Sequence, residues 1–135
     1  MAKRIRKPAD NQGELLLIYE AIKTLLVAYA NKDYTPREEG AINLYELYYK
    51  NDLRLGSTTV VKPCLGGVLP REKYVSFYLS VLQVAPDLEE QLAPDLLKLK
   101  KKHNFFHIRK ADATVLTHIK DALQTGDQFY QSKAC

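Results

Sequence analysis

The strongest candidate for chemistry in this 135-residue chain is a basic segment from Lys98 to Lys110. It carries six lysine or arginine side chains, together with two histidines and two adjacent phenylalanines. Clustered cations bind phosphate groups, and unpaired bases stack on aromatic or guanidinium planes. A second basic group lies in the first seven residues, and the two groups together predict nucleic-acid contacts by Lys3, Arg4, Arg6, Lys7, Lys98, Lys100, Lys101, Lys102, Arg109 and Lys110. The alternative interpretation is a row of solvated lysines at a helix end, where cations complement the helix dipole.

Three aromatic side chains are candidates for stacking on a base or for anchoring an interface. Phe105 and Phe106 lie inside the basic segment, and Tyr49 is one of nine tyrosines in the chain. Tyrosine is frequent at binding hot spots, but it is also a core residue whose hydroxyl reaches the surface. Helical spacing favours the core. Because Tyr45, Tyr48 and Tyr49 would span more than one face of a helix, we expect at least one of them to be exposed.

Metal binding and catalysis have no recognisable motif. His103 and His107 are four residues apart, as a helical metal pair requires, but the residues between them are poor helix formers and no third ligand has a suitable spacing. Cys64 lies near two glycines, yet a thiol nucleophile also needs a base and a lowered pKa. We therefore expect a protein that is not an enzyme and that holds no metal and no cofactor.

The composition is that of an ordinary globular protein. Hydrophobic residues make up 46% of the chain and charged residues 27%, which argues against wholesale disorder. The net charge of +4 suits an anionic partner but is far from histone-like. No signal peptide or membrane span is recognisable, and two cysteines make no disulfide framework. We therefore expect a cytoplasmic protein with reduced thiols.

Helices are the elements expected to position these residues, because hydrophobic side chains recur at helical intervals along most of the chain. The ranges expected to be helical are 12–31, 35–51, 70–84, 88–92, 96–103 and 112–124. The clearest helix start is at Thr35, where a threonine cap, a proline and Glu38 have the order of a capping box. The first range has the broadest apolar face, so we place it at the centre of the core.

The helical period fails over residues 53–69, where a β-branched run precedes a proline and two glycines. A small hairpin near residues 58–69 and a long ordered loop are both open interpretations. The expected fold class is all-α, with five to six helices around a central N-terminal helix. The expected division is a flexible basic arm over 1–11, one helical domain over 12–126 and a C-terminal tail over 127–135.

The leading functional hypothesis is a non-enzymatic helical binding module whose basic arm and Lys98–Lys110 segment contact nucleic acid or a nucleoprotein complex. The alternative is an interaction adaptor, inhibitor or assembly subunit that uses exposed tyrosines and the 53–69 loop against an acidic protein partner. These patterns specify neither the identity of the partner nor the oligomeric state.

Overall fold

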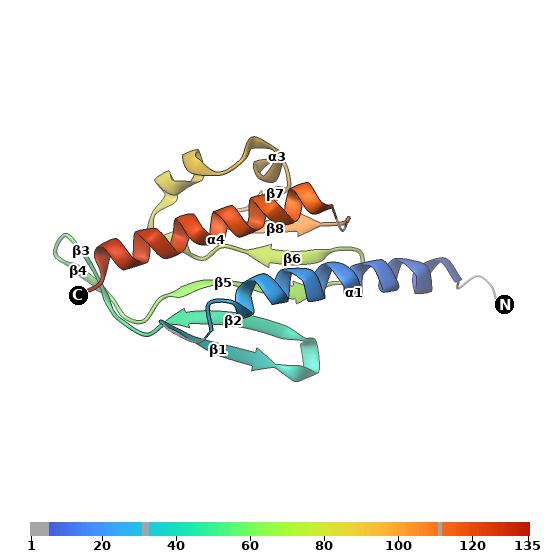
Figure 1. The fold of residues 1–135 in the computed structure, drawn as a ribbon, viewed down its shortest axis with the longest axis horizontal. Coiled ribbons are helices and arrows are strands. Elements are labelled where there is room, and N and C mark those ends of the chain that lie inside the picture. The colour runs from blue at the N-terminus through green and yellow to red at the C-terminus, as the bar shows by residue number, and fades with distance from the viewer. Residues whose placement is uncertain (1–5, 31–32, 111) are drawn as a thin grey trace.

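The protein folds into two layers, a six-stranded antiparallel sheet and two long helices that pack on one of its faces (Figure 1). The computed structural model describes residues 6–30, 33–110 and 112–135, and their side chains from residue 13 onward. The two long helices are α1 (Arg6–Val27) and α4 (Ala113–Lys133). The expected all-α bundle is therefore wrong, because most of the chain between the two helices is sheet.

The six strands lie in the order β1 (Tyr34–Glu39), β2 (Leu44–Tyr49), β5 (Cys64–Pro70), β6 (Val75–Tyr78), β8 (Phe105–Ile108) and β7 (Lys100–Lys102). Every neighbouring pair is antiparallel. A separate hairpin of β3 (Leu53–Leu55) and β4 (Thr58–Val60) lies between β2 and β5 in the chain. The 3-10 turn η1 (Gly40–Ile42) joins β1 to β2, and α2 (Val81–Val84), η2 (Pro86–Gln91) and α3 (Pro94–Leu97) connect β6 to β7.

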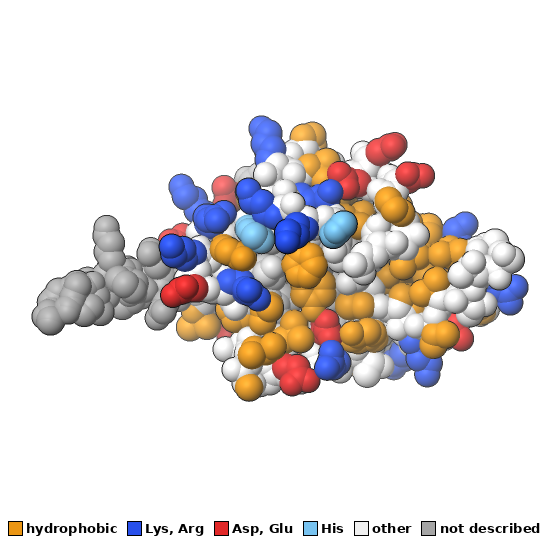
Figure 2. Space-filling view, turned by 180° about the vertical axis from the view of Figure 1, so that it is seen from behind, with side chains coloured by type: hydrophobic (Ala, Val, Ile, Leu, Met, Phe, Trp, Pro, Cys, Tyr) orange, Lys and Arg blue, Asp and Glu red, His pale blue; other side chains and the backbone are white. Residues whose placement is uncertain are grey.

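The hydrophobic core lies between the sheet and the two long helices. Its most deeply buried side chains include Ile18, Ile22, Leu26, Leu47, Tyr49, Val68, Phe77, Phe106, Ile108, Ile119 and Leu123. Side chains alternate between the two faces of a strand, so the residues between these core positions point away from the helices. No described helix covers that second face, which we call the open face (Figure 2).

The helix expected over residues 35–51 is wrong, since this range forms β1, η1 and β2. Pro36 lies in an edge strand, where proline is tolerated because one side of the strand has no hydrogen-bonding neighbour. In β2, Tyr45, Leu47 and Tyr49 are buried and alternate with residues of the open face. The alternation of buried and open-face residues in β2 is hard to recognise in the sequence, because the open-face position 48 is also a tyrosine.

The helix expected over residues 70–84 is also wrong for most of its length, because Val75–Tyr78 form β6 and only Val81–Val84 are helical, as α2. Its residues satisfy two periods, since Tyr74, Phe77 and Tyr78 recur at helical spacing while Val75 and Phe77 alternate as in β6. β-branched and aromatic residues favour a strand, and pairing with β5 and β8 on both sides decides the outcome. The helix expected over 96–103 ends at Leu97, and residues 100–102 form β7 instead.

The helices expected over 12–31 and 112–124 are present with different bounds. α1 begins at Arg6, so the described part of the expected arm is helical, while Lys3 and Arg4 lie outside the described residues. α4 continues to Lys133, through most of the expected tail. Asp112 caps α4 by accepting a hydrogen bond of 2.7 Å from the Thr114 amide. The hairpin expected near residues 58–69 spans 53–60 instead, and residues 64–70 form the inner strand β5.

A substitution of Gly66 in β5 tests the packing of the sheet, because the structure leaves no room for a side chain at this position. An added Cβ would lie 2.5 Å from the carbonyl oxygen of Tyr78 in β6. Gly66→Ala should therefore lower the free energy of unfolding, measured by urea denaturation, by about 1–3 kcal/mol. The control is Gly13→Ala in α1, where a Cβ meets nothing within 4 Å and should raise that free energy by up to about 1 kcal/mol. A Gly66→Ala variant as stable as the unchanged protein would contradict the packing of β5 beside β6.

Candidate functional site

The antiparallel register places one row of residues across five strands of the sheet. Arg37 of β1 lies opposite Glu46 of β2, and Glu46 lies opposite Gly67 of β5. Gly67 lies opposite Tyr78 of β6, and Tyr78 lies opposite Phe105 of β8. The rings of Tyr78 and Phe105 stack with their centroids 5.1 Å apart. We call these five residues the cross-sheet row.

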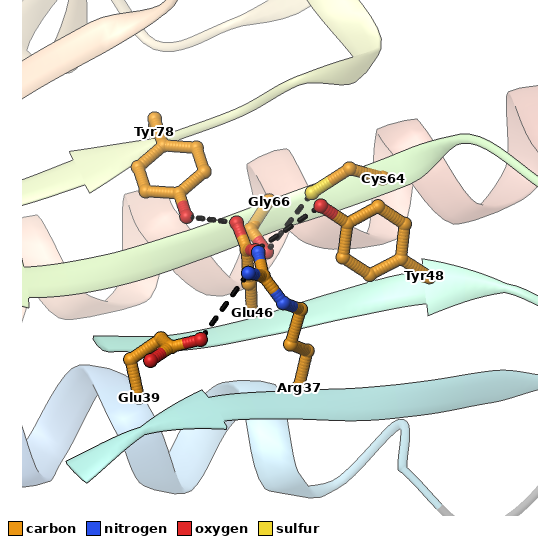
Figure 3. A network of polar contacts seen from close by, with 7 residues as sticks. All are labelled: Arg37, Glu39, Glu46, Tyr48, Cys64, Gly66 and Tyr78. Carbon is orange, nitrogen blue, oxygen red and sulfur yellow. Dashed lines mark hydrogen bonds and ion pairs between the residues drawn. The ribbon is translucent and has the colours of Figure 1, made fainter. Parts of the chain in front are cut away.

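Glu46 is the buried charge of the cross-sheet row, with its side chain 8% exposed. Its Oε1 accepts hydrogen bonds from the Arg37 guanidinium at 2.8 Å and from the Tyr48 hydroxyl at 3.1 Å, and its Oε2 accepts from the Tyr78 hydroxyl (Figure 3). Burial, and then the hydrogen bond to Glu46, raise the pKa of Tyr78 far above its ordinary value. Tyr78 is therefore a stable hydrogen-bond donor to this carboxylate at neutral pH.

Gly67 allows the Tyr78 side chain to cross β5. A Cβ at Gly67 would overlap the ring and hydroxyl of Tyr78 and would lie 2.9 Å from the Cβ of Glu46. A side chain here would therefore separate the tyrosine from the carboxylate. The glycine is required for the close approach of two side chains from different strands.

Cys64 lies beside the row, and its thiol is not activated for nucleophilic attack. Its Sγ is 3.7 Å from the carbonyl oxygen of Gly66. Burial raises the pKa of this thiol to about 11. Because the thiolate is the nucleophilic form of cysteine, the side chain at neutral pH is an inert, protonated thiol.

The open face also carries a cavity of about 270 Å³ near Phe105, which we call the basic pocket. It is lined by Arg71, Tyr74, Ser76, Lys101, Lys102, Phe105 and His107. Figure 2 shows Lys and Arg side chains gathered around histidines on this face, next to hydrophobic surface. The pocket therefore combines positive charge with aromatic rings.

A break in the register of β7 brings two consecutive lysines into the basic pocket. Lys100 pairs with Phe106 and Lys102 pairs with Phe105, so Lys101 is an extra residue in β7. Neighbouring side chains of a regular strand point to opposite faces, and an extra residue redirects them. Lys101 and Lys102 consequently both line the pocket, whereas Lys100 pairs with Glu89 at 3.0 Å.

Tyr74 and His107 form an aromatic wall of the basic pocket. Their ring centroids are 3.8 Å apart with the planes at 16°, and the Arg109 guanidinium lies 5.4 Å from the centroid of the Tyr74 ring. Burial, and then the positive charges of Arg109, Lys101 and Arg71, lower the pKa of His107. The imidazole is therefore neutral at pH 7, with one donor and one acceptor nitrogen.

The cations that line the basic pocket are not paired with carboxylates of the described side chains. Arg71, Lys101 and Lys102 make no ion pair within 4.0 Å with any carboxylate of the described side chains. Phe105, which is 38% exposed, adds a ring accessible from solvent. This arrangement can bind an anion that carries a flat ring.

Only part of the predicted nucleic-acid-binding set meets at this pocket. Lys101 and Lys102 line it, and Arg109 lies over its Tyr74 wall. The remaining cations lie elsewhere: Lys98 pairs with Asp95 at 3.7 Å, Lys100 pairs with Glu89, Lys110 is exposed beyond β8, and Arg6 and Lys7 lie in the first turn of α1. The side chains of Arg6 and Lys7, like all of Lys3 and Arg4, are outside the described part of the chain.

Of the three predicted stacking or interface residues, only Phe105 is exposed. Tyr49 and Phe106 are core residues, 1% and 0% exposed, because the alternation of β2 and β8 turns them toward the helices. Three lining residues outside the basic segment, Arg71, Tyr74 and Ser76, were not predicted from the sequence, and His107 was considered only as a metal ligand. Ser76 belongs to the alternation of β6, which identifies the open face only once β6 is paired with β8, whereas Arg71 and Tyr74 lie between β5 and β6.

The structure shows no metal site at the histidines of the described ranges. In the described ranges no three His, Cys, Asp or Glu side chains are grouped so that they could hold a metal ion. His103 lies in the turn before β8 with φ of 42° and His107 lies in β8, so they do not share a helix face. No helix of the described chain is long and apolar enough to cross a membrane.

Comparisons of the chain with protein-family models, with curated proteins and with solved structures found no match.

Tyr78→Phe tests the hydrogen bonds of Glu46. The substitution removes one donor from a buried carboxylate, so it should lower the free energy of unfolding by about 1.5–3 kcal/mol, measured by urea denaturation at pH 7. The control is Tyr74→Phe, which keeps the ring stacked on His107 and should change the stability by less than about 0.5 kcal/mol. Equal stability of the two variants would show that the Tyr78 hydroxyl does not support Glu46.

The raised pKa of Cys64 predicts slow thiol chemistry. At pH 8 a pKa of about 11 leaves about 0.1% thiolate, so Cys64 should react with an aromatic disulfide reagent about 100-fold more slowly than an ordinary exposed thiol. Cys135 is exposed and should supply the fast phase. Cys135→Ser should abolish that phase, and a fast phase that persists in this variant would refute the buried state of Cys64.

Proposed function

We propose that the protein is a non-enzymatic binding module. Its basic pocket binds a phosphate ester that carries a flat ring, as a nucleotide does. The supporting observation is that Arg71, Lys101 and Lys102, without ion-pair partners among the described residues, surround a cavity with exposed rings. Its volume of about 270 Å³ is just below the roughly 300–1,000 Å³ of pockets that enclose drug-sized molecules. A single nucleotide, partly exposed to solvent, suits that size.

Each group of lining residues has a role in this proposal. Arg71, Lys101 and Lys102 neutralise the phosphate, since arginine binds phosphate with two parallel hydrogen bonds and lysine acts as a point charge. Phe105 and the wall of Tyr74 and His107 supply surfaces for ring stacking, which is worth about 1–3 kcal/mol per base. The Ser76 hydroxyl and the neutral His107 add hydrogen-bonding groups for the edge of the ring.

The protonation states near the pocket favour binding over catalysis. Cys64 and Tyr78 are protonated at neutral pH because burial raises their pKa well above 7. A general acid or base works best with a pKa near the working pH. The proposal therefore contains no chemical step.

In this proposal the contacts to nucleic acid lie on the open face of the sheet, and not on a basic arm and a lysine-rich helix as the sequence predicted. A nucleotide can be free or part of a strand, and the test below includes both. The alternative of a protein-interaction adaptor stays a prediction. Its exposed tyrosines do not include Tyr49, which is buried.

The test is an NMR titration of the isotope-labelled protein with four probes: adenosine monophosphate, a uridine hexanucleotide, adenosine and inorganic phosphate. We expect saturable shifts in β6, β7 and β8 with the two phosphate esters, and weaker binding of adenosine and of phosphate alone. Binding should weaken as salt rises, because salt screens the attraction between the phosphates and the cations of the pocket. Shifts confined to α1 and α4, or no saturable shift with either ester, would overturn the proposal.

Lys102→Ala should weaken binding of adenosine monophosphate at least about fivefold, because it removes one of the pocket's cations. The matched control is Lys120→Ala, an exposed cation on α4 in the helical layer, which should leave the affinity unchanged. Equal affinities of the two variants would show that the anion binds elsewhere.

A further inference from the structure

The open face carries a second cationic cavity beside β1 and β2, which we call the distal pocket. Its volume is about 460 Å³, and it is lined by Thr35, Pro36, Arg37, Tyr48, Tyr49, Lys50 and Lys62. Lys50 and Lys62 are exposed, and neither makes an ion pair with a carboxylate of the described chain. Tyr48 is partly exposed beside them. The distal pocket thus repeats the combination of cations and an aromatic ring found in the basic pocket.

The register shows that the two pockets share one face of the sheet. Thr35 pairs with Tyr48, and Arg37 pairs with Glu46. In β2 these positions alternate with the core residues Leu47 and Tyr49, so they point away from the helices. The lining residues of the basic pocket in β6 and β8 alternate with core residues in the same way.

The cross-sheet row connects the two pockets. It runs from Phe105 beside the basic pocket to Arg37 in the distal pocket and crosses five adjacent strands. At a strand spacing of about 4.8 Å, the row spans about 19 Å. At the rise of about 3.4 Å per nucleotide that each strand has in B-form DNA, about six nucleotides cover this distance. That length lies within the roughly 4–16 nucleotides that single-strand-binding domains occupy.

The surface between the pockets carries little free charge. Glu46 is buried, and Arg37 pairs both with Glu46 and with the exposed Glu39 at 3.2 Å, so these three side chains together carry a net charge of −1. At the basic-pocket end of the row, the Phe105 ring, which is 38% exposed, stacks on the buried ring of Tyr78. Cations at both ends and an exposed ring at one of them can hold the backbone and a base of a single strand.

We infer that the ligand of the open face is single-stranded nucleic acid, which crosses the sheet from the basic pocket to the distal pocket. This inference rests on the proposed function, because the basic pocket holds one nucleotide of the strand. A single strand fits better than a duplex, since the exposed rings need unpaired bases for stacking. The distal pocket supplies a second phosphate contact through Lys50 and Lys62.

The experiment measures binding of fluorescein-labelled oligouridylates of one, three, six and nine nucleotides by fluorescence anisotropy. The Kd should fall at least about tenfold from one to six nucleotides and then level off, because six nucleotides span both pockets. The dependence of log Kd on log salt should also be steeper for the hexamer than for the mononucleotide, since more phosphates are neutralised.

Variants separate the two pockets. The double variant Lys50→Ala and Lys62→Ala should weaken hexamer binding at least about fivefold and leave mononucleotide binding unchanged. Lys102→Ala should weaken both. The matched control is the double variant Lys120→Ala and Lys133→Ala, two exposed cations of α4, which should change neither affinity. Circular dichroism establishes that each variant keeps its fold.

Each contrary outcome has a distinct meaning. Equal Kd values for the mononucleotide and the hexamer would overturn the inference and leave the proposed function standing. Binding of neither would overturn both. A hexamer affinity insensitive to Lys50 and Lys62 would overturn the path across the sheet. Tighter binding of a duplex of equal length, or equally tight binding of polyglutamate, would replace the single strand with a duplex or an acidic protein.

Discussion

A carboxylate removed from water must be matched by charge and by hydrogen bonds, and Glu46 imposes this constraint on the whole sheet. Its donors come from three strands, since Arg37 lies in β1, Tyr48 in β2 and Tyr78 in β6. They meet only in one register, because a slip of one residue would turn each side chain to the other face. Gly67 must also stay small where the tyrosine crosses β5. One buried charge therefore specifies the alignment of four strands.

The hydrogen bonds of Glu46 also help to position the candidate binding site, because the ring of Tyr78 stacks on the ring of Phe105. The hydrogen bond to Glu46 holds the Tyr78 ring, and Phe105 packs against that ring at the mouth of the basic pocket. The aromatic rings of the pocket are thus held in place by stacking and by the hydrogen bond to Glu46, whereas its cations are exposed. A binding surface ordered in advance loses little conformational entropy when it binds.

Local sequence signals are sufficient to predict the two long helices but not to predict the sheet. The apolar stripes of α1 and α4 predict helices correctly, because each pattern is complete within its own segment. The strands depend on pairing with distant segments, and tyrosines on both faces of β2 conceal the alternation. The basic segment was correctly identified as rich in cations, but the extra residue Lys101 decides which lysines reach the pocket. Arg71 and Ser76 join them only through the pairing of β6 with β8, which no local pattern reveals.

The position of β7 at the edge of the sheet has a consequence for solubility. An edge strand exposes unpaired backbone groups to which a strand of another molecule can add, and lysine side chains are a common protection against this. Lys100, Lys101 and Lys102 make up the whole of β7. A polyanion bound next to this edge would neutralise part of that charge and reduce the repulsion between molecules. Under the proposed function, Lys101 and Lys102 would both attract the ligand and keep sheets apart, so ligand binding would favour self-association through one short strand.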